Sequence, residues 1–172
     1  MREVIHFAWG NSSLGEFMIA MSDNGLVALE FTSSRASAEA ALHARFPEAE
    51  LIESSEALAS ILERASRAIE DPEFDPKIPL DLRGTPYELE VWSMLRALPV
   101  GETTSYGALA AKLGTRDARS VTEAIASNPV AVLVPCHRVI KKDGSISGYR
   151  WGVKRKRELL ARERRNKPFR LD

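Results

Sequence analysis

The only cysteine in this chain of 172 residues, Cys136, stands directly before His137, one of three histidines. A thiolate is a strong nucleophile, and a neighbouring imidazole is a base that accepts the thiol proton. Adjacent side chains point to different sides of a helix or strand, so the two groups meet only through a tight turn or a bridging water. The pair is a candidate nucleophile with its base, and a small buried hydrophobic cysteine is the alternative.

Glu163 is the candidate for a third member of this group. It follows two leucines by three and four residues on a final helix predicted over residues 153–163, so it shares their buried side. A buried carboxylate needs a partner, and an imidazole would complete a Cys–His–Glu arrangement like that of thiol proteases. An ion pair with a neighbouring arginine, such as Arg162 or Arg164, is the alternative.

Three helices are predicted ahead of the cysteine, over residues 86–98, 106–113 and 117–127. Gly114 is suited to end the second helix, and Asp117 is suited to cap the third. The short connection between them is typical of a helix-turn-helix, with an ordinary helical hairpin as the alternative. Residues at helical spacing form the exposed face of the third helix: Arg119, Thr122, Glu123 and Ala126.

The first half of the chain predicts a small lobe with a sheet. Alternating apolar residues on both sides of an Asn-Gly turn predict a β-hairpin over residues 14–31. Residues 3–9 are suited to add a strand, and apolar residues at helical spacing predict helices over 37–46 and 58–69. A short apolar run at 130–134, between two prolines, indicates a buried strand or extended segment.

Four prolines between residues 71 and 86 indicate a break between two lobes. We therefore expect an α+β protein. A small N-terminal α/β lobe with the antiparallel hairpin sheet would span residues 1–75, and a linker would span residues 76–86. A mainly helical C-terminal lobe with the helix-turn-helix would span residues 87–172. Nothing in the first lobe resembles a site, so we expect it to give structural support.

The formal net charge is zero, but the charge is unevenly distributed. Residues 1–100 hold 8 Lys and Arg against 17 Asp and Glu, whereas residues 138–172 hold 13 against 4. A basic block of this kind favours binding to polyanions such as nucleic acid. A solvated helix followed by a loose tail is the alternative.

Composition excludes several classes of protein. Hydrophobic residues make up 44% of the chain, which is enough for a folded core. No stretch approaches the ~20 apolar residues that span a bilayer, and the N-terminal stretch lacks the apolar region of a signal peptide. One cysteine excludes an internal disulfide and a cysteine-rich zinc site, and it fits a reducing compartment. We expect a cytoplasmic protein, nucleoid-associated if bacterial, without membrane contact or a metal.

Four sequence stretches surround the candidate nucleophile: SYGALAAKLG at 105–114, ARSVTEAIASNP at 118–129, PCHRVI at 135–140 and DGSISGYRWG at 143–152. They resemble the O6-alkylguanine-DNA alkyltransferase family, most closely the C-terminal half of the bacterial Ada proteins. The resemblance is continuous over about residues 84–163 and extends more weakly over nearly the whole chain.

The resemblance implies a DNA repair protein, a methylated-DNA–protein-cysteine methyltransferase. Such a protein flips O6-alkylated guanine, mainly the methylated base, out of double-stranded DNA. It then moves the alkyl group irreversibly to its own cysteine, once per molecule. Extruding a base costs a few kcal/mol, and less for a mispaired lesion.

The resemblance also implies a role for each residue that matches the family motifs. Cys136 would accept the alkyl group, and His137 would take the thiol proton through water. Glu163 would orient His137, and Asn128 would order the turn around it. Tyr106 would donate a proton to the guanine, which leaves poorly as an anion.

The second helix of the helix-turn-helix would enter the minor groove of the DNA. Arg119 would fill the gap left by the flipped base, with Ser120, Thr122 and Ala126 beside it. No cofactor is implied, because the substrate carries its own alkyl group, and we expect a monomer. The pocket for the base would be lined by six residues: Val139, Ser147, Gly148, Tyr149, Arg150 and Trp151.

Two residues depart from the family pattern. Glu123 places a carboxylate on the expected DNA face, where it would repel phosphate and weaken binding. Trp151 stands where some relatives have a small residue, so we expect a narrow pocket that favours methyl over bulky alkyl groups.

Two other functions stay open from the sequence. One is a protein that binds alkylated DNA without transferring the alkyl group, although relatives of that kind lack the cysteine. The other is a thiol hydrolase that uses Cys136, His137 and Glu163 and turns over many times.

Overall fold

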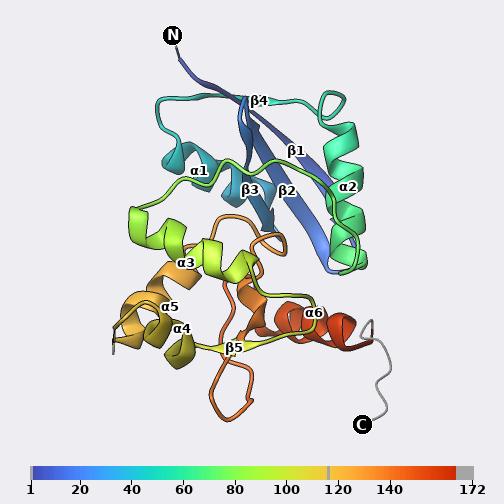
Figure 1. Cartoon of the computed structure of the whole chain (residues 1–172). Coiled ribbons are helices and arrows are strands. Elements are labelled where there is room, and N and C mark those ends of the chain that lie inside the picture. Colours follow the sequence, from blue (N-terminus) through green and yellow to red (C-terminus); the bar gives the residue numbers. More distant parts are fainter. Residues whose placement is uncertain (1, 116, 166–172) are drawn as a thin grey trace. The chain divides into compact units, whose positions relative to one another are not determined.

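A computed structural model describes residues 2–115 and 117–165 of the chain (Figure 1). The protein belongs to the α+β class, as the sequence predicts, and its chain divides into two compact units. The first unit comprises Met1–Glu70, Phe74–Arg83 and Pro129–Ala131. The second comprises Asp71–Glu73, Gly84–Asn128 and Val132–Asp172. Among the described residues, no helix combines the length and apolar character needed to cross a bilayer.

The first unit is built on a four-stranded sheet with the order β3-β2-β1-β4. The predicted hairpin is present as β2 and β3, and β1 pairs antiparallel with β2. The fourth strand runs parallel to β1 and was not predicted, because its four residues, Glu-Leu-Ile-Glu, show no alternating pattern. The strands have these bounds: β1 Val4–Ser12, β2 Gly15–Ser22, β3 Gly25–Phe31 and β4 Glu50–Glu53.

Two helices cover opposite faces of this sheet (Figure 1). Helix α1 (Arg35–Arg45) contributes Leu42 to a core that also contains Phe7 of β1. Helix α2 (Ala59–Glu70) packs on the other face, where β1 carries Gly10. A Cβ at Gly10 would lie 3.0 Å from a methyl group of Leu62, so glycine permits the close approach of this helix. Both helices begin and end within two residues of their predicted limits.

The segment expected to be a linker belongs largely to the first unit. The amide of Leu26 donates to the carbonyl of Pro79 (2.8 Å), and the amide of Asp81 donates to the carbonyl of Leu26 (2.9 Å). Gly25 has φ 148°, and a Cβ there would lie 2.6 Å from the Pro79 carbonyl oxygen. The structure therefore shortens the expected linker, because prolines do not prevent an extended segment from hydrogen bonding along a strand edge.

The second unit is mainly helical. Helix α3 starts with a capping box, in which Thr85 accepts from the Glu88 amide and the Glu88 side chain accepts from the Thr85 amide. Ser105 caps α4 and Asp117 caps α5, as predicted for Asp117, and Gly114 follows α4 with φ 74°. The elements have these bounds: α3 Pro86–Arg96, β5 Thr104–Ser105, α4 Tyr106–Lys112, α5 Ala118–Ala126, η1 Cys136–Arg138, β6 Val139–Ile140 and α6 Val153–Arg165.

Helices α4 and α5 form the predicted pair and pack against each other. Helix α5 also packs on α3, where the indole nitrogen of Trp92 donates to the carbonyl of Ala124 (2.8 Å). Val121, Ala124 and Ile125 are buried on this side, which leaves the opposite face of α5 exposed. The two-residue strands β5 and β6 pair in parallel and were not predicted, because so short a pairing leaves no periodic signal.

Candidate active site

The Cys136 thiol lies in a one-turn 3₁₀ helix, η1, directly after Pro135. A tight turn is one of the two arrangements that the sequence allows for a reaction between the neighbouring Cys136 and His137. The Asn128 side chain holds the turn from outside by donating to the carbonyl of Val134 (2.9 Å), and the Cys136 amide donates to the same carbonyl (2.8 Å). The structure thus places the Asn128 side chain against the residues that lead into η1.

The chain enters this turn through a strained residue. Val132 has φ 69°, a left-handed conformation that β-branched residues rarely adopt and that costs ~1–2 kcal/mol. Immediately before it, the Ala131 amide donates to the carbonyl of Leu29 (2.8 Å) in the first unit. Residues 129–131 thus belong to the first unit, whereas Asn128 and Cys136 belong to the second. The strained residue Val132 lies where the chain passes from residues 129–131 back into the second unit.

Cys136 is only 3% exposed. Burial raises the pKa of its thiol to about 11, against the opposing effects of a hydrogen bond from Asn128 and the positive charges of Lys156 and Arg150. The sulfur is therefore protonated at neutral pH in the free protein. The thiol therefore needs a base that removes its proton during the reaction, because the free protein holds no preformed thiolate.

His137 and Glu163 form a buried pair, as predicted. The Nε2 atom of His137 lies 2.5 Å from Oε2 of Glu163, and the side chains are 1% and 3% exposed. Burial lowers the pKa of His137, against the raising effect of the carboxylate, so the imidazole is neutral at pH 7. Its Nε2–H then donates to Glu163, which leaves the lone pair on Nδ1. Nδ1 is buried and has no hydrogen-bond partner among the described residues.

Glu163 has two further donors that the sequence did not reveal. Nε of Arg138 donates to Oε1 of Glu163 (2.8 Å), and the amide of Gly101 donates to the same oxygen (3.0 Å). Burial alone would raise the pKa of Glu163, but the hydrogen bond from His137, the nearby positive charges and the Gly101 amide lower it to about 2. Glu163 therefore pairs with the imidazole of His137 and also with Arg138, which is not one of the neighbouring arginines on α6 that the sequence suggested.

A cavity of about 420 Å³ opens beside the Cys136 thiol. It lies within the second unit and is large enough for one nucleobase. The walls come from α4, α5, η1 and the loop between β6 and α6. The lining residues are Tyr106, Thr122, Ile125, Ala126, Cys136, Lys141, Ser147, Gly148, Tyr149 and Arg150.

Two of the residues expected in the pocket wall lie behind it. Val139 is fully buried in β6, where its backbone pairs with Thr104. Trp151 is 7% exposed and packs edge-on against Tyr149, with ring centroids 5.3 Å apart. Neither is among the residues that line the cavity. If Trp151 narrows the cavity, it does so by positioning Tyr149, which lines the cavity.

The exposed face of α5 carries the residues expected to contact DNA. Thr122 and Ala126 lie at the mouth of the cavity, and Arg119 is exposed one turn earlier. Among the described residues no ion pair joins Arg119 to Glu123 on this face. Ser120 and Glu123 line a separate cavity of about 460 Å³ toward α3, together with residues such as Tyr87 and Glu88.

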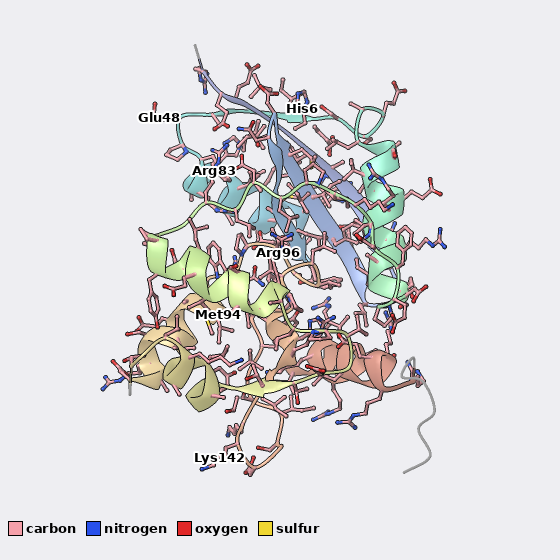
Figure 2. All side chains as sticks on the ribbon, in the orientation of Figure 1. His6, Glu48, Arg83, Met94, Arg96 and Lys142 are labelled. Atoms are coloured by element: carbon pink, nitrogen blue, oxygen red, sulfur yellow. The ribbon has the colours of Figure 1, made fainter. Side chains whose placement is uncertain are left out.

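No group of three or more His, Cys, Asp and Glu side chains among residues 2–115 and 117–165 is arranged to hold a metal ion. The loop between β6 and α6 carries two exposed lysines, Lys141 at the cavity and Lys142 beyond it (Figure 2). Positive charge near the cavity entrance favours a polyanionic partner.

A family model matches most of the second unit, and a solved structure matches nearly the whole chain. Residues 86–165 match the family model described as "6-O-methylguanine DNA methyltransferase, DNA binding domain". The crystal structure of Mycobacterium tuberculosis OGT in complex with DNA is 33% identical, covers 95% of each chain and superposes with a TM-score of 0.76. The chain belongs to the O6-methylguanine-DNA methyltransferase family.

Other members of this methyltransferase family are similar over part of their length. The bifunctional transcriptional activator/DNA repair enzyme Ada of Escherichia coli is 36% identical over 94% of this chain and 46% of its own length. A methylated-DNA–protein-cysteine methyltransferase of Mycolicibacterium paratuberculosis is 49% identical over 58% of this chain and 59% of its own. The chain thus spans about half the length of the curated relatives it matches.

Four residues of this candidate site were not singled out from the sequence: Ile125, Arg138, Lys141 and Lys156. Arg138 was within the quoted PCHRVI motif, but its partner Glu163 lies 25 residues away. The buried position of Lys156 could have been predicted from the sequence. It lies three and four residues before two buried leucines on α6, so helical spacing places its amine on the buried side.

Proposed function

We propose that this protein transfers the O6-alkyl group of alkylated guanine, mainly methyl, from double-stranded DNA to Sγ of Cys136. The transfer forms a thioether, which is permanent, so each molecule reacts once. The observation that carries the proposal is a buried thiol that lines a base-sized cavity and shares a one-turn 3₁₀ helix with an imidazole whose Nδ1 has no hydrogen-bond partner among the described residues. A thiolate is the soft nucleophile that displacement at a saturated carbon requires.

The damaged base reaches this cavity by leaving the duplex. In our proposal α5 lies in the minor groove, and Arg119 takes the place of the extruded guanine in the base stack. Thr122 and Ala126 are small enough to let the groove approach the cavity mouth. Glu123 lies on the same exposed face and opposes tight binding by repelling phosphate.

The thiol is activated by proton transfer when the substrate is bound. The proton leaves Sγ through a water molecule to Nδ1 of His137, while Nε2–H keeps its hydrogen bond to Glu163. The carboxylate stabilises the imidazolium that forms, and Arg138 keeps the carboxylate ionised. The sulfur then attacks the alkyl carbon, and the bond between that carbon and O6 breaks.

The guanine takes a proton as it leaves. Tyr106 lines the cavity and is the proposed donor, because protonation spares the base from leaving as an anion. The edge-on contact of Trp151 with Tyr149 restricts the far wall, which favours methyl over bulky groups. We propose that the protein acts as a monomer. The reaction needs chromosomal DNA and a reduced thiol, which places the protein in the cytoplasm.

Intact-protein mass spectrometry after incubation with duplex DNA containing O6-methylguanine tests this proposal. We expect one methyl group per protein molecule, located on Cys136 after proteolysis, and no further reaction when more DNA is added. Cys136→Ser is the control, and it should bind the lesion without gaining mass. An unmodified wild-type protein that still binds the lesion would identify a binding module, and turnover on esters or amides would identify a hydrolase.

A further inference from the structure

A buried lysine is joined to the proposed proton donor by one serine. Nζ of Lys156 donates to Oγ of Ser147 (3.2 Å) and to the carbonyl of Gly148 (3.3 Å). Oγ of Ser147 lies 2.5 Å from the hydroxyl oxygen of Tyr106. The three groups come from α6, the loop before it and α4, and all belong to the second unit.

Packing alone does not explain the lysine. Lys156 is 1% exposed on the same side of α6 as Leu159 and Leu160, a position where methionine or leucine would fill the same space. Burial of an ammonium group is costly unless the group is hydrogen-bonded, and it lowers the pKa of Lys156. A lysine with a lowered pKa gives up its proton more readily than one in water.

The direction of the hydrogen bonds follows from the donor inventory. An ammonium group can only donate, so Ser147 Oγ accepts from Lys156. The single hydrogen of the serine hydroxyl is then available to the oxygen of Tyr106. In that arrangement the phenolic hydrogen of Tyr106 is not used by Ser147, and it is free to point into the cavity that both residues line.

We propose that Ser147 and Lys156 are positioning residues that direct and replace the proton donated by Tyr106. This inference rests on the proposed function. As the carbon–O6 bond breaks, its electron pair stays with the base, which takes a proton from Tyr106. Ser147 passes its proton to the Tyr106 oxygen and takes one from Lys156, which ends as a neutral amine. The thiol proton remains on His137, so protons and electrons balance without another reactant.

A second role for Lys156 must be separated from this one. Its positive charge also favours the Cys136 thiolate, since it opposes the rise in the thiol pKa. Iodoacetamide distinguishes the two roles, because it alkylates the same sulfur and releases iodide, which needs no proton. A relay through Tyr106 affects only methyl transfer from guanine, whereas a charge effect on the sulfur affects both reactions.

The central experiment compares Ser147→Ala with wild type in both reactions at saturating DNA. We expect the single-turnover rate of methyl transfer to fall about tenfold or more, with the iodoacetamide rate unchanged. Ser147→Thr restores a hydroxyl and should recover most of the transfer rate. In a Tyr106→Phe background the serine substitution should have no further effect, because the group through which it acts is gone.

Lysine variants complete the test. Lys156→Met should slow methyl transfer more than iodoacetamide alkylation, and Lys154→Met, an exposed position on the same helix, should change neither. Equal slowing of both reactions by Lys156→Met or Ser147→Ala would overturn the relay, as would wild-type transfer by Ser147→Ala. A wild-type protein that transfers no methyl group would instead overturn the proposed function itself.

Discussion

At the residue scale, the site holds a buried thiol in its neutral form next to the groups that can take its proton. Desolvation raises the pKa of Cys136 and lowers that of His137, so both groups are neutral in the resting protein. Neutral groups are compatible with a buried site, and charge separates only when the substrate fills the cavity. Glu163 is the fixed charge in this arrangement, and Arg138 compensates it at 2.8 Å.

The transfer rate should depend on pH through His137. The imidazole accepts a proton only when neutral, and burial lowers its pKa below the ordinary 6.5, so activity should extend to lower pH than an ordinary histidine base would allow and be lost as the pH falls through that lowered pKa. Glu163→Gln removes the carboxylate that raises this pKa. Its acid limb should therefore shift to lower pH, while the plateau rate falls at least about tenfold because a neutral amide stabilises the imidazolium less than a carboxylate does. Single-turnover rates from pH 4.5 to 8 measure both effects, and an acid limb that moves upward would contradict the assignment.

Arg138 should be more important for stability than a surface arginine. Arg138→Met leaves the buried Glu163 carboxylate without its counter-ion and the Leu98 carbonyl without its donor. We expect a loss of about 3 kcal/mol in the free energy of unfolding, measured by urea denaturation. Arg138→Lys keeps the charge but not the two-pronged geometry, so it should lose less. Equal stability of Arg138→Met and wild type would show that the ion pair contributes nothing.

At the element scale, caps and short pairings position the site. The capping box of α3 fixes the start of the helix on which α5 packs. The parallel pairing of β5 with β6 brings Thr104 and Ser105, just before Tyr106, beside Val139 and Ile140, just after η1. Two backbone pairs thus place the proposed acid of α4 next to the nucleophile of η1.

Loss of the α3 cap should destabilise the protein by a predictable amount. Thr85→Ala removes the oxygen that accepts from the Glu88 amide (3.1 Å), and we expect a loss of about 1 kcal/mol. Thr103→Ala is a matched control at an exposed position outside the helices, with an expected change within about 0.5 kcal/mol. Chemical denaturation of both variants gives the comparison. Equal values would mean that the capping box is not formed in solution.

At the scale of the whole molecule, charge and chain connectivity matter. The basic excess lies after residue 137, in the same part of the chain as the loop and α6 of the site. The first unit contains no part of the cavity described here, but it holds residues 129–131 by hydrogen bonds to Leu29. These hydrogen bonds lie within the first unit, and the chain continues from Ala131 to Val132 of the second unit.

DNA binding by the Cys136→Ser variant should weaken steeply with salt. Phosphate neutralisation releases counterions, so raising the salt from about 50 to about 200 mM should reduce the affinity by roughly ten- to hundredfold. Fluorescence anisotropy with lesion-containing and undamaged duplexes measures this effect. The two slopes should agree, since phosphate contacts do not read the lesion. A salt-independent affinity would exclude the basic segment as a DNA contact.

The sequence by itself determined the hairpin, the helices, the caps at Asp117 and Gly114, and the nucleophile with its neighbouring base. These features are local, since side-chain period, turn chemistry and capping act within a few residues. It also determined that Glu163 faces inward, because helical spacing fixes the side of a residue. Only the tertiary structure decided what each inward group meets. Arg138 pairs with Glu163, and Lys156 is linked through Ser147 to Tyr106, because the packing of α6, η1 and α4 selects partners that no periodic pattern encodes.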